Sequence, residues 1–163
     1  MRVRAQSADV AKVTSCLANG WTFLSGERRT FEYVHGPAPQ LDLAEFCYFL
    51  PLAVQESVAV GGVGVFIGRA DARTLAVNMF GESPQAINTG NLNDACAEAC
   101  NVLADCVTRN ITQQADIVIG LPFRADCLVF AEISGTCEPV AIYQCNTGAG
   151  QLFVIAYEIA RQS

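Results

Sequence analysis

Apolar residues recur at helical spacing in three stretches of the chain, which predicts three helices. The first is expected over residues 8–24, the second over 70–80, ending near Gly81, and the third and longest over 94–111. Ser7 and Asn93 stand where each can cap a helix N-terminus. The apolar stripe of the first helix ends in a tryptophan that we expect in the core; the stripe consists of Val10, Val13, Leu17 and Trp21.

Short apolar stretches between and after the helices predict strands, because they are rich in β-branched and aromatic residues. Strands are expected over residues 31–34, 46–50, 57–60 and 63–67, and near 127–133, 140–145 and 152–159. Gly61-Gly62 predicts a hairpin between two of these strands, and Gly148-Ala149-Gly150 predicts a turn before the last. The pattern predicts an α/β fold, a mostly antiparallel sheet with two or three long helices packed on one face. A length of 163 residues fits a single domain over residues 1–163.

The charge of the chain excludes several classes of function. The formal net charge is −6, Lys12 is the only lysine, and the arginines are scattered. No basic stripe exists to neutralise the phosphates of a nucleic acid, and an acidic chain does not dock on an anionic membrane. The sequence also lacks a signal-peptide core and any apolar run of the ~18 residues that span a membrane. We therefore expect a cytoplasmic protein that binds neither nucleic acid nor membrane.

Eight cysteines form a high and even count, so disulfides and metal sites must be considered. The cysteines lie inside apolar runs such as Phe46-Cys47-Tyr48, no Cys-x-x-Cys occurs, and His35 is the only histidine. Zinc-ligand spacing is therefore missing, although Cys96 and Cys100 stand one helical turn apart. We expect eight reduced thiols, mostly buried as small hydrophobic side chains, with a redox or metal role as the alternative.

The helix over residues 94–111 carries a polar stripe. At 100° per residue, its small and apolar residues fall on one side and its polar residues on the other, where Glu98 and Asn101 are neighbours at i and i+3. The simplest interpretation is a solvated helix face on which Asp105 and Arg109 form a surface ion pair. The polar stripe consists of Asp94, Glu98, Asn101, Asp105, Thr108 and Arg109.

The sequence around Glu98 resembles the signature of the CheC/CheX/FliY phosphatase family. The segment Asp94-Ala-Cys-Ala-Glu98-Ala-Cys-Asn101-Val-Leu-Ala-Asp resembles the family's Glu-x-x-Asn on an exposed helix with a small, apolar opposite face. Three further segments fall in the family's order, so that the resemblance covers about residues 54–159. They are Ala76-Val-Asn-Met-Phe-Gly-Glu82, Ile117-Val-Ile-Gly-Leu-Pro122 and Leu152-Phe-Val-Ile-Ala-Tyr-Glu158.

The chain also departs from the family pattern. CheC-type members resemble two pseudo-repeats that each carry a site, whereas the N-terminal half here contains no second Glu-x-x-Asn. A single site indicates the CheX type. Asp105 adds a negative charge one turn beyond Asn101, and residues 27–50 match no part of the family that we can name.

The resemblance implies a function and a partner. It implies a phosphatase that removes the aspartyl phosphate of a CheY-like response regulator in two-component or chemotaxis signalling. Asn101 would orient the attacking water, and Glu98 would accept an ion pair from the partner's active-site lysine. Mg²⁺ is expected on the partner, and no cofactor is expected on this chain. The resemblance also implies a homodimer joined through sheet edges.

Other interpretations remain beside the phosphatase. The rival is a non-catalytic module that binds a response regulator, or a flagellar-switch adaptor. The glycines of residues 61–68 miss the dinucleotide fingerprint and no Gly-Lys-Ser/Thr follows, so we interpret them as a hairpin with close backbone packing. A cysteine nucleophile would need a histidine partner, and His35, beside Gly36, is expected on the surface.

Overall fold

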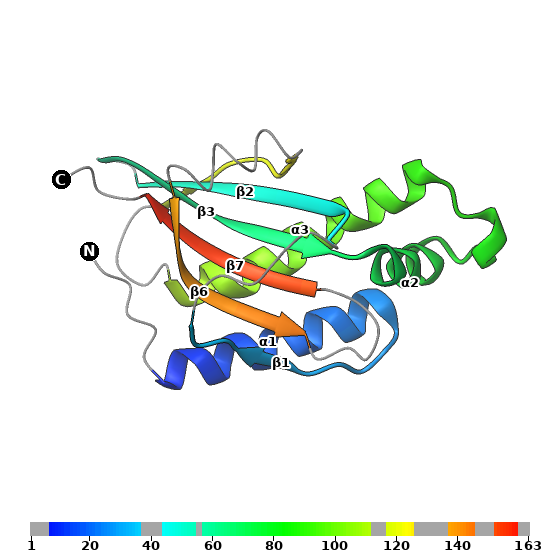
Figure 1. Cartoon of the computed structure of the whole chain (residues 1–163), viewed down its shortest axis with the longest axis horizontal. Coiled ribbons are helices and arrows are strands. Elements are labelled where there is room, and N and C mark those ends of the chain that lie inside the picture. Colours follow the sequence, from blue (N-terminus) through cyan, green and yellow to red (C-terminus); the bar gives the residue numbers. More distant parts are fainter. Residues whose placement is uncertain are drawn as a thin grey trace.

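Helices pack against one face of an antiparallel sheet in this computed structural model (Figure 1). The structure describes residues 7–36, 44–54, 57–111, 117–125, 137–145 and 152–159. The described helices are α1 (Ser7–Ser25), α2 (Arg69–Phe80), α3 (Thr89–Ile111) and a 3₁₀ turn over Pro84–Ala86. The strands are β1 (Phe31–Tyr33), β2 (Phe46–Val54), β3 (Ser57–Ile67), β4 (Ile117–Ile119), β5 (Phe123–Arg124), β6 (Cys137–Cys145) and β7 (Leu152–Ile159).

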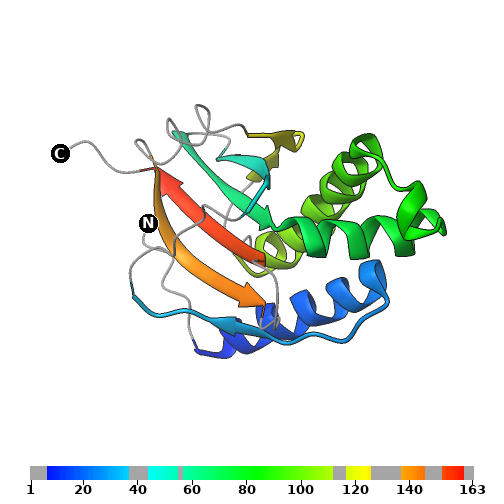
Figure 2. The ribbon, with the colours of Figure 1, turned by 45° about the vertical axis from the view of Figure 1, so that its right-hand side comes forward.

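Among the described residues the sheet has seven strands; six follow the order β1-β6-β7-β3-β2-β4, and β5 also pairs with β2. All of these pairings are antiparallel. Helix α3 passes behind β3 and β7 in Figures 1 and 2 and packs against α1, α2 and the sheet. The predicted α/β fold, with a mostly antiparallel sheet covered by helices on one face, is confirmed. The predicted strand over 127–133 and the predicted turn at 148–150 lie outside the described residues.

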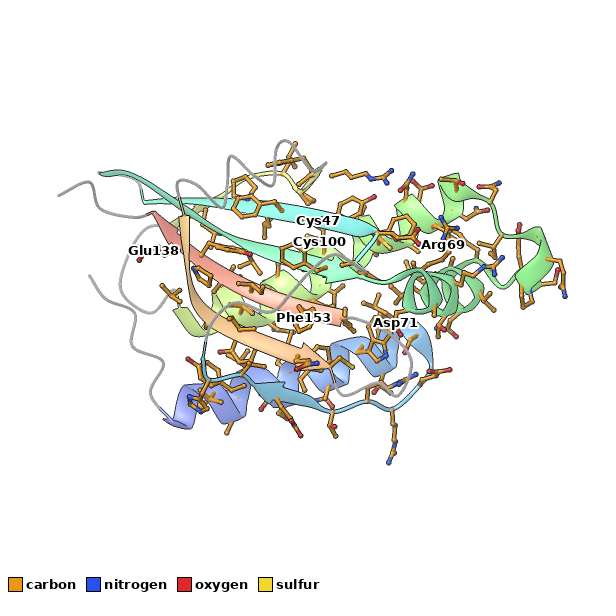
Figure 3. All side chains as sticks on the ribbon, viewed as in Figure 1. Cys47, Arg69, Asp71, Cys100, Glu138 and Phe153 are labelled. Atoms are coloured by element: carbon orange, nitrogen blue, oxygen red, sulfur yellow. The ribbon has the colours of Figure 1, made fainter. Side chains whose placement is uncertain are left out.

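The core divides into two clusters because side chains alternate across the sheet. Along β2, Tyr48 and Leu50 join the cluster beneath the helices, whereas Phe49 joins the cluster on the opposite face. Trp21 of α1 is completely buried in the helical cluster, as the sequence predicts. The smaller cluster includes Phe153, which Figure 3 labels on β7.

The hairpin prediction at Gly61-Gly62 is wrong, because both glycines lie inside the continuous strand β3. Gly61 pairs with Leu52 and Gly62 with Pro51, and the pairing of β2 with β3 continues as far as Val54 and Ser57, which pair with each other. A Cβ on Gly62 would come within 2.3 Å of Phe49 Cζ and 2.7 Å of the Leu50 carbonyl oxygen. The expected close packing is therefore correct, and Gly62 serves as a packing residue within the sheet.

Helix α3 begins earlier than predicted, at Thr89, so Asn93 lies inside the helix and does not cap it. Asn88 and Asn91 close the N-terminus instead. The Asn91 amide N–H donates to Asn88 Oδ1 at 2.9 Å, and the Asn88 amide N–H donates to Asn91 Oδ1 at 3.0 Å. This reciprocal pair satisfies two N–H groups that a helix start leaves without partners within the helix.

Candidate functional site

The apolar side of α3 fixes the helix against the rest of the molecule. Small side chains allow α3 to approach the sheet and α1 closely, and burial of this face drives the packing. The Tyr48 hydroxyl, on β2, also donates to the Asn93 carbonyl oxygen at 2.9 Å, and burial raises the pKa of Tyr48. The buried residues of α3 include Ala95, Cys96, Ala99, Cys100, Leu103, Ala104, Cys106 and Val107.

The opposite side of α3 exposes Glu98 and Asn101, as the sequence predicts. Their i, i+3 spacing places them next to each other on the helix surface. Within the described part of the chain, neither side chain forms a hydrogen bond or an ion pair. The carboxylate and the amide are therefore both available to an outside group.

A groove of about 400 Å³ adjoins Asn101. It lies between α3 and the segment that connects β4 to β5, and Glu98 stands outside it. The lining residues are Leu50, Asn101, Val102, Asp105, Thr108, Arg109, Gly120, Leu121 and Pro122. Asn101 is thus placed where a partner could reach both an exposed helix face and a concave surface.

The segment from Gly120 to Pro122 forms the far wall of this groove. The Gly120 N–H donates to the Pro51 carbonyl oxygen at 2.9 Å, and a Cβ at position 120 would lie 2.6 Å from Pro51 Cγ. This contact ties the segment to β2 and leaves Leu121 85% exposed. In the sequence, this stretch stood out only as part of the family pattern. The position of Leu121 between a glycine and a proline was the one sequence feature that indicated an exposed loop leucine.

Asp105 and Arg109 form the expected surface ion pair at the edge of the groove. The distance from Arg109 Nη2 to Asp105 Oδ2 is 2.6 Å, and both side chains are substantially exposed. Thr108, one turn after Asp105 and next to Arg109, is buried, although the sequence places it on the polar stripe; its hydroxyl donates to the Asp105 carbonyl oxygen at 3.2 Å. An exposed pair of this kind is screened by solvent and contributes little to stability.

The described cysteines behave mainly as core residues. Cys96, Cys100, Cys106 and Cys145 are buried, and burial raises the pKa of each thiol to about 12. Cys100 lies on the sheet side of α3, and Cys47 lies on β2 (Figure 3). The described residues contain no group of three or more His, Cys, Asp or Glu side chains arranged to hold a metal ion. His35 is exposed, as the sequence predicts.

Solved structures with the same architecture include several chemotaxis proteins. The chemotaxis protein CheX from Vibrio vulnificus is 14% identical, with a TM-score of 0.64, and the match covers 92% of this chain and 98% of that one. A CheX in complex with CheY, BeF₃ and Mg²⁺, from Borrelia burgdorferi, is 12% identical, with a TM-score of 0.66 and coverage of 97% and 100%. This chain has the CheX fold. The resemblance found in the sequence is thereby confirmed at the level of the fold.

A solved structure with another name shares this architecture. FliM, solved in a complex with SpeE from H. pylori, is 7% identical, with a TM-score of 0.60, and the match covers 96% of this chain and 90% of that one. No protein-family model matches the sequence, and no curated protein matches it either. Among the described residues, no helix has the length and apolar character needed to cross a membrane.

Proposed function

We propose that this chain is a CheX-type member of the CheC/CheX/FliY family that dephosphorylates a CheY-like response regulator. One observation carries the proposal: Glu98 and Asn101 stand side by side on the exposed face of α3, with no internal partner in the described chain. A structure of the same fold holds CheY with BeF₃ and Mg²⁺, and this supports a response regulator as the partner class.

Asn101 is proposed to position the attacking water. Its side chain has both a donor and an acceptor, so its carbonyl oxygen can accept one hydrogen of a water molecule beside the acyl phosphate. Phosphoryl transfer depends mostly on positioning and charge stabilisation, and a water held in line has a high effective molarity. This role requires no covalent intermediate on the chain and no side chain with a shifted pKa.

Glu98 is proposed to hold the partner in register. Its exposed carboxylate would accept a charge-assisted hydrogen bond from the lysine of the regulator's active site. The Mg²⁺ that neutralises the phosphoryl oxygens would belong to the regulator, so the chain needs no cofactor of its own. The proposal also includes a homodimer joined through sheet edges.

The alternative is a module that binds a response regulator without hydrolysing its phosphate. The similarity to FliM supports this alternative, because it extends the fold beyond the proteins called CheX. Such a module would use the same exposed helix face. Only a rate measurement separates the two functions.

Asn101→Ala tests the proposal. The substitution removes the amide that orients the water without touching the core, so we expect the dephosphorylation rate to fall on the order of 10²-fold or more. Asn19→Ala is the matched control, because Asn19 is also an exposed asparagine on a long helix. The measurement is phosphate loss from a panel of phosphorylated regulators, with thermal melts of each variant.

Two results would count against the proposal. If the parent accelerates decay of no regulator in the panel, the binding module becomes the better explanation. If the parent accelerates decay and Asn101→Ala is equally fast, the activity resides elsewhere on the molecule.

A further inference from the structure

Two cysteines from different helices lie in contact. Cys16 belongs to α1 and Cys106 to α3, and their side chains share a hydrogen bond. The helices approach closely here because Gly20, one turn after Cys16, has no side chain. A Cβ on Gly20 would lie 3.8 Å from Cys106 Sγ and 3.2 Å from Val102 Cγ1. Packing of α1 on α3 thus holds the two sulfur atoms together.

The two thiols differ in their access to solvent. Cys16 is half-buried, whereas Cys106 is 4% exposed. Burial raises the pKa of Cys106, and the hydrogen bond with Cys16 raises it further, so Cys106 remains a protonated thiol. An oxidant in solution therefore reacts with Cys16 first, and the buried Cys106 thiol is in contact with Cys16. A solvent-accessible thiol next to a second thiol that can attack its oxidised form is an arrangement that forms disulfides reversibly.

We propose that Cys16 and Cys106 form a redox modification site, at which peroxide converts the thiol pair into a disulfide that ties α1 to α3. Cys16 loses its proton, and its sulfur attacks one peroxide oxygen. The O–O bond breaks, so Cys16 becomes a sulfenic acid and the first water forms. The sulfur of Cys106 then attacks the sulfenic sulfur. The S–S bond forms as the S–O bond breaks, and the hydroxyl group leaves with the Cys106 proton as the second water.

This disulfide would join α1 to α3, the helix that carries Glu98 and Asn101. It would close a loop of about 90 residues between positions 16 and 106, which restricts the unfolded chain and raises the melting temperature. Cys96 and Cys100 provide a comparison, because this second pair of cysteines lies one turn apart within α3 and both members are fully buried. Peroxide has no exposed member of that pair to attack. The proposal does not depend on the phosphatase function, and its test needs no regulator.

The test uses reduced full-length protein exposed to excess hydrogen peroxide and then alkylated and digested without reductant. We expect a cross-linked peptide that contains Cys16 and Cys106, a loss of two of the eight thiols, and recovery of both with dithiothreitol. The oxidised chain should melt several degrees higher, roughly 5 °C or more. Cys16→Ser should abolish the cross-link and the shift, whereas Cys96→Ser should retain both.

Three results would overturn the proposal. The first is parent protein in which Cys16 and Cys106 are both alkylated after peroxide treatment. The second is Cys16 recovered as sulfinic acid while Cys106 is still a thiol. The third is a cross-link between Cys16 residues of two chains. Because all three are read on the parent chain, a failure of Cys16→Ser to fold leaves the test intact.

Discussion

Asp71 is the one buried carboxylate among the described residues, at 4% exposure. It lies near the beginning of α2 (Figure 3), and its Oδ2 has no hydrogen-bond partner in the described part of the chain. Burial raises the pKa of Asp71; the charge of Arg29 lowers it and that of Glu27 raises it. Arg29 is itself engaged with Glu27, at 2.9 Å between Nη2 and Oε2. The folded protein therefore favours the protonated form of Asp71.

Asp71 should make the folded state less stable as the pH rises. Because the pKa of Asp71 is higher in the folded than in the unfolded chain, the folded state binds more protons. The free energy of unfolding therefore decreases as the pH rises from the ordinary carboxyl pKa of 3.8 through the raised pKa of the folded state. In Asp71→Asn this part of the pH dependence should disappear. At neutral pH the variant should melt higher than the parent by a few degrees, roughly 2–5 °C.

The measurement is the melting temperature of parent and variant from pH 3.5 to about 8, the interval over which linkage of a raised carboxyl pKa acts. Glu82→Gln is the control, because Glu82 is an exposed acid just after the same helix. That variant should keep the slope of the parent. An Asp71→Asn curve parallel to the parent curve at every pH would refute the interpretation.

At the scale of elements, the pairing of β2 with β3 depends on glycines that lie opposite large neighbours. Gly62 lies against Phe49 and the backbone of Leu50, where even a methyl group has no space. The two strands also support the site: β2 contributes Leu50 to the groove, and Pro51 holds Gly120 in place. A distortion of the β2–β3 strand pair would therefore change the shape of the groove beside Asn101.

Gly62→Ala should destabilise the protein by about 1–3 kcal/mol, the usual cost of forcing extra volume into a packed core. Gly90→Ala is the comparison, because Gly90 is exposed in the first turn of α3, a Cβ there would meet only the Asn88 side chain, at 3.1 Å from its Oδ1, and alanine favours a helix by about 1 kcal/mol. The same chemical change should thus be unfavourable in β3 and neutral or favourable in α3. Urea denaturation of both variants measures the difference, and a Gly62→Ala midpoint at or above that of the parent would contradict the packing argument.

The whole molecule divides into a structural side and an exposed side. The sheet, α1 and the inner face of α3 bury most of the apolar side chains, while the outer face of α3 and the wall at Leu121 remain open. The chain carries a net charge of −6, so a phosphorylated acidic site on a partner is repelled at long range. The proposed complex therefore needs a specific contact with a partner cation, and Glu98 is the side chain proposed to make it.

Substitution of Glu98 should affect partner affinity and turnover together. Glu98→Gln should weaken both by about 10- to 100-fold, the equivalent of one hydrogen bond to a charged group. Glu98→Lys should be worse, because it opposes like charges in a closed interface. Glu82→Lys is the control with the same charge change on an exposed residue outside the proposed site.

The experiment pairs binding to a BeF₃-treated regulator with turnover of the phosphorylated regulator. Both variants should melt like the parent, because Glu98 makes no ion pair within the described chain. Turnover that survives Glu98→Lys would keep the enzyme but move its active site. Weakened binding in a parent that has no turnover would instead favour the adaptor.

The sequence by itself determined the features that arise from local periodicity. The observed α1, Ser7–Ser25, and α2, Arg69–Phe80, differ from their predicted ranges by one residue at most at each end. The exposed stripe with Glu98 and Asn101 followed from 100° steps along one helix. The last strand, Leu152–Ile159, has the predicted bounds. In each case the apolar pattern and the observed element have the same period, so tertiary contacts did not change the outcome.

Only the tertiary structure decided the features that join distant residues. Gly61-Gly62 has the local chemistry of a turn, yet pairing with Leu52 and Pro51 keeps it in a strand. Strands β4 and β5 are too short to show a period, and they form because β2 offers hydrogen-bond partners. The groove beside Asn101 and the contact of Cys16 with Cys106 each join segments that are far apart in sequence. Such contacts depend on how helices and strands pack, and the local pattern of apolar and polar residues does not show which distant segments will meet.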